Sequence, residues 1–293
     1  MQPLVAVARR LPQGLQDVLI SLYWSRFNYP VKIATLRRYR AGVRDHPLLA
    51  AKYLAFDPEI DNFTYDLANE DELVSFLAES LDRDPREVER YLAEVRADSE
   101  FERLVRERLK KKRWTRKQRP QFGRRLGWYA IARAVKPRVI VETGIHDGLG
   151  SVLLLRALEW NAADGHEGRL ISFDINPRSG WLVSEPLSSR WRAVYKATSD
   201  ALENELQDVE VGMIIHDSDH TYECEHFELA MAVAHAAPTI ALVSDNAHAT
   251  TALPDLASSL GIDYHFFREK PQDHFYPGAG IGLALLFRPS VAA

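Results

Sequence analysis

Acidic residues end four apolar segments in the second half of the chain, and these positions carry the clearest chemistry. Glu142, Asp174 and Asp217 each end one segment, and the pair Asp245-Asn246 ends a fourth. Carboxylates can accept hydrogen bonds from sugar hydroxyls, bind cations or take up protons. Because acids are depleted in strands, their recurrence at the ends of apolar segments indicates a site. Helix capping could account for one or two of them.

A glycine-rich turn follows the first of these segments. Val139 to Glu142 is apolar and β-branched, Gly144, Gly148 and Gly150 follow it, and a helical pattern begins at Ser151. Such a turn between a strand and a helix lets the backbone approach a ligand at the carboxyl edge of a parallel sheet. The Gly-x-x-x-Gly-x-Gly spacing differs from the dinucleotide fingerprint and disfavours an NAD-dependent dehydrogenase. A turn without a ligand is the plain alternative.

A second motif, His216-Asp-Ser-Asp-His-Thr-Tyr-Glu223, surrounds the third strand end. It resembles the Asp-x-Asp-His-x-Tyr sequence of cation-dependent O-methyltransferases that modify small molecules and sugars. The glycine turn likewise resembles motif I of the class I S-adenosylmethionine-dependent methyltransferases, and the likeness covers roughly residues 125–293. It implies an acid on the cofactor ribose and polar residues near the adenine. The implied cofactor-binding residues are Glu142, Gly144, Gly148, Ser151, Asp174, Ser199, Asp200 and Asp217.

The same resemblance implies a divalent cation at Asp217, Asp245 and Asn246, although Asn246 replaces the second acid of the sugar-modifying branch. Ends of neighbouring strands lie about 4.8 Å apart, so their side chains can converge on one ion. Two carboxylates and an amide oxygen suit Mg²⁺ first, then Mn²⁺ or Ca²⁺. A cation would orient the acceptor hydroxyl and lower its pKa.

The resemblance also places a base at His220, whose ordinary pKa of about 6.5 suits proton transfer at neutral pH. Lysine, the base of the catechol-type enzymes, is absent there. Asp219 is the rival base, or it holds His220 in one tautomer. The plain alternative makes His220 an ordinary residue of the first helical turn, with Asp219 or Ser218 as the helix cap.

The elements that position these residues alternate between strand and helix patterns. Alternation predicts βαβ units in a doubly wound, mostly parallel sheet, and the resemblance implies a seven-stranded Rossmann-like one. The last two strands have no helix between them and predict an antiparallel last strand, which the methyltransferase fold has. The expected helices are 125–135, 151–161 and 221–236, and the expected strands are 139–142, 170–174, 211–217, 240–246, 264–267 and 280–287.

Residues 1–120 show helical periodicity without convincing strands and predict an α-helical N-terminal domain. Leu15, Val18, Leu19 and Leu22 form one stripe. The sequence Asp84-Pro-Arg-Glu87 is a capping signature ahead of apolar residues at helical spacing. We therefore expect a basic linker up to about residue 125 and a methyltransferase domain over 121–293.

Composition excludes several classes of protein. The chain has 293 residues, 46% of them hydrophobic and 27% charged, with a net charge of -4, as in ordinary globular domains. Its single cysteine, Cys224, excludes an internal disulfide or a cysteine zinc cluster and is expected in the core. Without a signal-like segment or a run of about 18 apolar residues, we expect a cytoplasmic protein with no membrane partner.

A basic block over 103–125 is expected to be a solvated helix face or linker, and nucleic acid is not an expected partner. The leading hypothesis is an O-methyltransferase that uses S-adenosylmethionine and a cation on a small-molecule or sugar hydroxyl. The alternative is a non-catalytic, methyltransferase-like scaffold whose helical domain and basic segment contact a partner. The acceptor, the role of the helical domain and the oligomeric state stay open, with a homo-oligomer compatible with the sequence.

Overall fold

The fold comes from a computed structural model that describes residues 15, 28–57, 59, 63–111 and 119–287. Internal contacts divide the chain into two compact units. The sheet unit comprises residues 69–101, 124–269 and 279–293, and the helical unit comprises 1–68, 102–123 and 270–278. The helical unit thus takes its third segment from the connection between the last two strands of the sheet unit.

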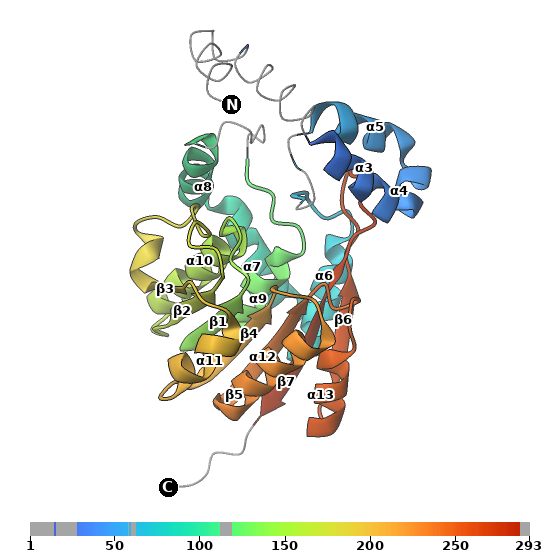
Figure 1. Cartoon of the computed structure of the whole chain (residues 1–293). Coiled ribbons are helices and arrows are strands. Elements are labelled where there is room, and N and C mark those ends of the chain that lie inside the picture. Colours follow the sequence, from blue (N-terminus) through green and yellow to red (C-terminus); the bar gives the residue numbers. More distant parts are fainter. Residues whose placement is uncertain (1–14, 16–27, 58, 60–62, 112–118, 288–293) are drawn as a thin grey trace, which may run out of the picture. The chain divides into compact units, whose positions relative to one another are not determined.

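The sheet unit contains a seven-stranded sheet with the strand order β3-β2-β1-β4-β5-β7-β6 (Figure 1). Strands β1 to β5 are parallel, whereas β7 lies antiparallel between β5 and β6. This arrangement confirms the predicted fold class, including the antiparallel last strand. The strands are β1 (Val139–Thr143), β2 (Arg169–Phe173), β3 (Trp191–Val194), β4 (Val211–His216), β5 (Ala236–Asp245), β6 (Tyr264–Arg268) and β7 (Gly280–Phe287).

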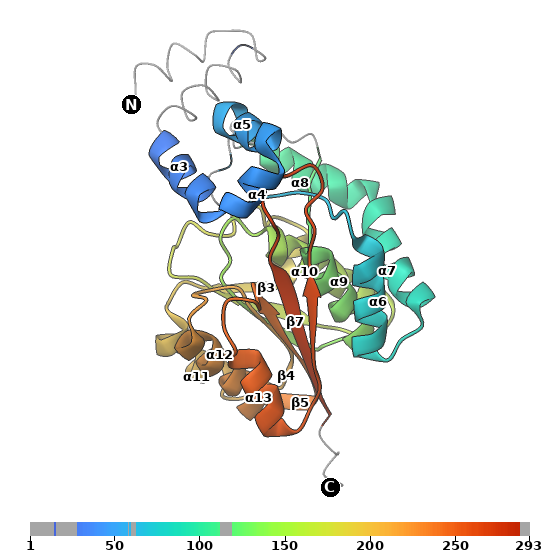
Figure 2. The ribbon, with the colours of Figure 1, turned by 90° about the vertical axis from the view of Figure 1, so that its right-hand side faces the viewer.

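Helices cover both faces of the sheet (Figure 2). On one face lie α11 (Thr198–Leu206), α12 (Tyr222–Ala234) and α13 (Ala252–Leu260). The other face carries α9 (Arg125–Val135), α10 (Leu149–Ala163), α6 (Glu70–Leu81) and α7 (Pro85–Ala97), and a short 3₁₀ helix (Leu187–Arg190) precedes β3. Coverage of both faces explains why the central strands are continuous apolar runs in the sequence.

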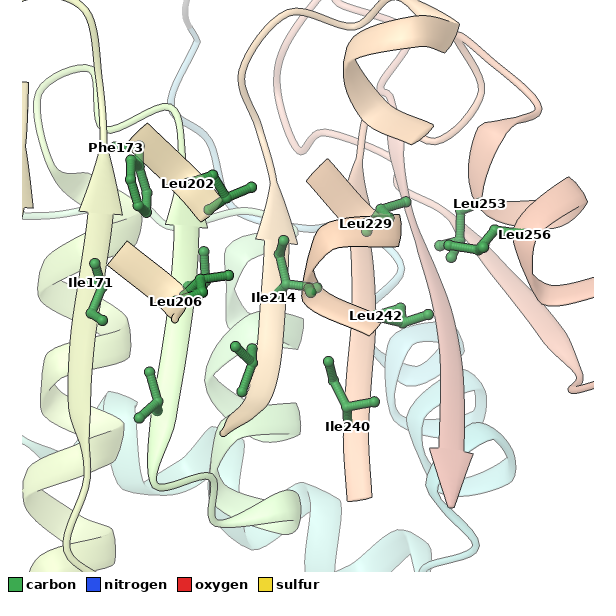
Figure 3. Close-up of a cluster of buried hydrophobic side chains, with 14 of the residues drawn as sticks. Ile171, Phe173, Leu202, Leu206, Ile214, Leu229, Ile240, Leu242, Leu253 and Leu256 are labelled. Carbon is green, nitrogen blue, oxygen red and sulfur yellow. The ribbon is translucent and has the colours of Figure 1, made fainter. Parts of the chain in front are cut away.

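One side of the sheet unit holds a continuous apolar core (Figure 3). Ile214 of β4 and Leu242 of β5 are fully buried on the face that α11, α12 and α13 cover. Burying a leucine or isoleucine side chain of this kind stabilises the fold by roughly 2 kcal/mol. The core is completed by Ile171, Phe173, Leu202, Leu206, Leu229, Ile240, Leu253 and Leu256.

The structure adds elements that the sequence pattern did not predict. Residues 193–195 read as an apolar turn, yet Trp191–Val194 forms the edge strand β3, of which only Val194 is buried. Thr198–Leu206 and Ala252–Leu260 are helices, the second with Pro254 in its first turn, where proline is tolerated. A short edge strand and short helices carry little periodicity, which explains their absence from the prediction.

The predicted capping signature is confirmed in α7. The Asp84 side chain accepts a hydrogen bond from the Arg86 backbone N–H at 2.8 Å, and Val88, Tyr91, Leu92 and Val95 are buried. By their contacts, α6 and α7 belong to the sheet unit, although the predicted N-terminal domain includes them. The predicted domain boundary near residue 120 stays a prediction. Of the predicted stripe, Val18, Leu19 and Leu22 lie outside the described residues.

The helical unit contains α3 (Tyr29–Arg38), α4 (Arg40–Asp45), α5 (Pro47–Phe56) and most of α8 (Ser99–Lys111). Backbone hydrogen bonds from Ala68 N to Lys270 O (2.8 Å) and from Gln272 N to Asp66 O (2.7 Å) tie its separate segments together. An aromatic cluster around Phe63 includes His274 and Phe275, with ring centroids 4.7 and 5.6 Å from Phe63. In the described part of the chain no helix has the length and apolarity needed to cross a membrane.

Candidate active site

The glycine turn after β1 is held against the end of β4. Gly144 has a φ of +86°, and a Cβ placed on it would lie 1.9 Å from the carbonyl oxygen of Asp217. Only glycine allows both this conformation and this close approach. The N–H of Gly144 donates to Phe173 O at 2.9 Å, and that of Asp217 donates to Thr143 O at 2.9 Å. The turn therefore joins the carboxyl ends of β1, β2 and β4.

A cavity of about 790 Å³ opens at these strand ends. Gly144, Asp174, Ser199 and Asp217 line it, as does Asp219. These residues come from the loops after β1, β2 and β4 and from the first turn of α11, so the structure brings them together. Of the other residues expected to bind the cofactor, Glu142, Gly148, Ser151 and Asp200 are not part of this lining.

Asp174 organises the turn as well as lining the cavity. Its Oδ2 accepts hydrogen bonds from the backbone N–H of Ile145 (3.1 Å) and His146 (2.9 Å), and its Oδ1 accepts one from Asn176 N (2.8 Å). Each carboxylate oxygen has two lone pairs, so Asp174 keeps acceptor capacity for a ligand hydroxyl. The cap expected as the plain alternative and a ligand-binding role are therefore compatible.

Glu142 lies behind the turn with 1% of its surface exposed. Its Oε2 accepts hydrogen bonds from Ser151 Oγ and Ser172 Oγ, both at 2.6 Å. Burial raises the pKa of Glu142 to about 7, against the lowering effect of the two serine hydroxyls. Glu142 and Ser151 thus connect β1, α10 and β2 and support the turn from below.

The two remaining residues of the predicted cofactor set also have other surroundings. Gly148 caps the N-terminus of α10 with a φ of +90°, and a Cβ there would lie 3.0 Å from the Cα of Gly180. Asp200 is exposed in the first turn of α11 and accepts a hydrogen bond from Ser199 Oγ at 3.0 Å. Their direct contact with a cofactor stays a prediction.

The acids at the ends of β4 and β5 converge as the strand spacing predicted. Ligand atoms of Asp217, His220 and Asp245 lie within 4.8 Å of one another. Burial and the neighbouring charge of Asp245 raise the pKa of Asp217 well above its usual range. For Asp245 burial acts in the same direction, but the Arg124 guanidinium outweighs it and holds the pKa below its usual range.

Arg124 was expected in a solvated basic segment, yet its side chain is only 8% exposed and reaches into this acid cluster. Its Nε donates to Asp245 Oδ1 at 2.6 Å, and its Nη2 donates to Asp245 Oδ2. Its Nη1 donates to Glu269 Oε1 at 2.9 Å. Arg125 approaches Asp217 Oδ2 at 3.8 Å. The expectation for the basic block is wrong for these two arginines, because the start of α9 packs at the strand ends.

The predicted cation does not fit this arrangement. Both oxygens of Asp245 accept hydrogen bonds from the Arg124 guanidinium, so a cation bound to this carboxylate would lie beside a like charge in a buried site. The Oδ1 of Asn246 also faces Arg124 Nη2, at 3.4 Å. The donor types of the cluster suit Mg²⁺, but a guanidinium already contacts Asp245 and Asn246.

His220 is fixed by Asn246 at the edge of the cluster. The Nδ2 of Asn246 donates a hydrogen bond to His220 Nε2 at 2.7 Å, which places the ring proton of neutral His220 on Nδ1. Burial lowers the pKa of His220, so the ring is neutral at pH 7. Asn246 adopts a φ of +53°, a conformation that asparagine tolerates.

A buried network around Glu228 supports the cavity from beneath, and no local signal marks it in the sequence. Glu228 is 0% exposed and accepts hydrogen bonds from Thr143 Oγ1 (2.5 Å), Thr198 Oγ1 (2.7 Å) and Ser218 Oγ (2.9 Å). His216 Nδ1 lies 2.6 Å from its Oε2. Thr198 and Ser218 line the cavity, so one carboxylate connects two of its walls.

The sheet order defines a Rossmann-like fold, and the cavity lies at the carboxyl ends of its strands, where folds of this kind bind ligands. Residues 141–247 match the model of a family described as a methyltransferase domain. The matched residues include the glycine turn and the His216–Glu223 motif, so the match agrees with the resemblance to methyltransferases that these two motifs carry. None of the curated proteins matches the chain.

Solved structures similar to the chain have low identities. They include the O-methyltransferase TomG from Streptomyces achromogenes, involved in tomaymycin synthesis, in complex with S-adenosylmethionine (15% identity over 65% of this chain and 91% of that one, TM-score 0.47). Another is the O-methyltransferase from Bacillus cereus in complex with S-adenosylhomocysteine (11% identity, 73% and 96%, TM-score 0.40). We base no argument on similarities of this size.

Proposed function

We propose that the chain transfers a methyl group from S-adenosylmethionine to a hydroxyl oxygen of a small molecule or sugar. The observation that carries this proposal is the cavity of about 790 Å³ lined by Gly144, Asp174 and Ser199. Ligands of doubly wound sheets bind at the carboxyl ends of the strands, and small-molecule pockets usually measure about 300–1,000 Å³.

In the proposed reaction, the acceptor oxygen attacks the methyl carbon in line with the carbon–sulfur bond. An O–C bond forms, the C–S bond breaks with its electron pair on sulfur, and S-adenosylhomocysteine leaves. The acceptor proton passes to a base of the protein. Asp174 would hold the ribose hydroxyls, and the glycine turn would allow the cofactor to approach the backbone of β1 closely.

Two residues are proposed as the proton acceptor. Asp219 lines the cavity directly and is exposed to it. His220 is neutral at pH 7, but its Nε2 lone pair accepts the Asn246 amide hydrogen, so it can take a proton only after that hydrogen bond opens. His220→Ala or Asp219→Ala should lower kcat by about 10²-fold, depending on which residue is the base. Rates within about twofold of wild type for both variants would exclude both.

Calorimetric titration of the full chain with S-adenosylmethionine, S-adenosylhomocysteine and NAD tests the cofactor. Binding of the first two without NAD is the expected result. Asp174→Ala should weaken S-adenosylmethionine at least about tenfold, because charge-assisted hydrogen bonds contribute roughly 1.5–3 kcal/mol each. Glu203→Ala is the matched control, since Glu203 is an exposed acid of α11 outside the cavity lining. Equal effects of the two variants, or binding of NAD alone, would refute the proposal.

Cys224 offers an independent footprint of the same cavity. It is the single cysteine of the sequence, and it is half-buried in the cavity wall. The prediction that it lies in the core is therefore wrong. Burial raises the pKa of its thiol, so alkylation is expected to be slow at neutral pH. S-adenosylmethionine should slow the alkylation further, as measured by mass spectrometry of the intact chain, whereas NAD should have no effect. An unchanged rate at saturating S-adenosylmethionine would contradict binding in this cavity.

A further inference from the structure

Arg124 reaches into the acid cluster at the ends of β4 and β5 and contacts Asp245 directly. Each of its three guanidinium nitrogens donates a hydrogen bond. Nε donates to Asp245, Nη1 donates to Glu269, and Nη2 donates to both Asp245 and Asn246. We propose that this guanidinium takes the place of the divalent cation that the resembling O-methyltransferases hold at these strand ends. The inference rests on the proposed function for its catalytic consequence, which is methyl transfer without a metal ion.

The first argument concerns the available ligands. Asp245 and Glu269 have 0% of their side chains exposed, and Arg124 binds Asp245 with a two-nitrogen fork. Such a paired, charge-assisted geometry is among the strong side-chain interactions. A cation at Asp245 would have to share this carboxylate with the fork and lie next to a guanidinium of like charge. Asn246 is committed as well, since its oxygen faces Arg124 and its nitrogen donates to His220.

The second argument concerns charge. Asp217, Asp245 and Glu269 face two guanidinium groups, because the Nη2 atom of Arg125 lies 3.8 Å from Asp217 Oδ2 and the Arg125 side chain is only 10% exposed. A divalent cation among these acids would lie within a few ångströms of both arginines. Repulsion between like charges is weakly screened in a buried site. The two arginines already supply the positive charge that these carboxylates require.

The third argument is the position of Arg124 in the chain. It directly precedes α9, and α9 packs against β4 and β5. This packing carries the side chain from the helix start to the strand ends. The pair Arg124-Arg125 ends the basic block of the sequence, and burial among acids explains two of its charges without a nucleic acid partner.

Binding of Mn²⁺ to the full chain, measured by electron paramagnetic resonance, tests the proposal directly. We expect the wild-type chain to show no site with a Kd below about 1 mM, the weak end of protein cation sites. Arg124→Met frees the oxygens of Asp245, Asn246 and Glu269 and should create a site at least about tenfold tighter. Arg124→Lys is the control, because it keeps a positive charge in the cluster and should not create such a site. The proposal would be overturned if the wild-type chain bound Mn²⁺ with a Kd of about 100 µM, as other protein cation sites do, and if Asp245→Asn removed that binding.

A second measurement separates this inference from the proposed function. The affinity of the wild-type chain for S-adenosylmethionine is measured with EDTA and with excess Mg²⁺, and we expect the two values to agree within about twofold. A loss of about tenfold or more in EDTA would overturn the proposal. Absence of S-adenosylmethionine binding in both buffers would refute the proposed function, while the Mn²⁺ titration of the wild-type chain would still decide the role of Arg124. If Arg124→Met fails to fold, the Mn²⁺ titration of the wild-type chain still tests the proposal.

Discussion

Replacement of Glu228 by alanine should destabilise the sheet unit far more than replacement of Glu225, its neighbour on α12. Both glutamates are buried, with exposed fractions of 0% and 2%. Glu228 has five side-chain partners among the described residues: Thr143, Thr198, Ser218, His216 and Cys224. Glu225 accepts a hydrogen bond from Thr250 Oγ1 at 2.6 Å. The pair therefore differs mainly in the number of polar groups that lose their partner.

The magnitude follows from that difference. Hydrogen bonds to a charged group contribute roughly 1.5–3 kcal/mol each, but networks are not additive and the freed hydroxyls can rotate toward other acceptors. We expect Glu228→Ala to lower the free energy of unfolding by about 3–5 kcal/mol and Glu225→Ala by about 1–2 kcal/mol. At roughly 2–4 °C per kcal/mol for a unit of this size, the melting temperatures of the two variants should differ by about 5–10 °C.

Thermal melts and urea titrations followed by circular dichroism measure this difference, with the urea slope checked for constancy. The pH dependence supplies a second test. Burial would raise the pKa of Glu228, but the hydrogen bonds from His216 and Thr143 outweigh it and hold the pKa below 4.5. The stabilisation is therefore complete above pH 4.5 and is lost as the pH falls through the lower folded-state value. Variants within about 1 kcal/mol of each other at pH 7 would refute the reasoning.

Further substitutions test the turn, its support and the helix packing. Gly144→Ala should destabilise the fold several times more than Gly165→Ala in thermal melts. Both glycines have a φ of +86°, but of the two only Gly144 has a neighbour within 4 Å of the added Cβ, so equal losses of stability would contradict the close approach to Asp217. Glu142→Gln should be more stable than wild type by about 3 kcal/mol at pH 8, because the folded-state pKa of Glu142 is about 7 and its ionisation opposes folding as the pH rises above 4.5. Urea titrations at several pH values measure the difference, and a difference that does not shrink toward pH 4.5 would exclude this cause. Arg133→Met breaks the pair between the buried Arg133 guanidinium and Glu94 and should cost about 3–5 kcal/mol by urea titration. A cost below about 1 kcal/mol would mean that this pair contributes little.

The fold could be predicted from short stretches of sequence because its elements carry local signals. The apolar run at Val139 and the glycines after it predict a strand and a turn, and the structure places β1 and Gly144 there. Helix α9 has the predicted bounds, and β7 is the predicted antiparallel strand. Elements with weak periodicity, such as the edge strand β3, were recognised only in the structure.

The sequence by itself determined where the acids stand, at the carboxyl ends of strands, because strand periodicity and turn chemistry are local properties. Only the tertiary structure decided which partners those acids have. Arg124 meets Asp245 across 121 positions of the chain, and Glu228 meets Thr143 across 85. Such pairs depend on strand register and on the helix packed behind each strand. No local pattern encodes either, so the guanidinium in the acid cluster could not be read from the motif that predicted a cation.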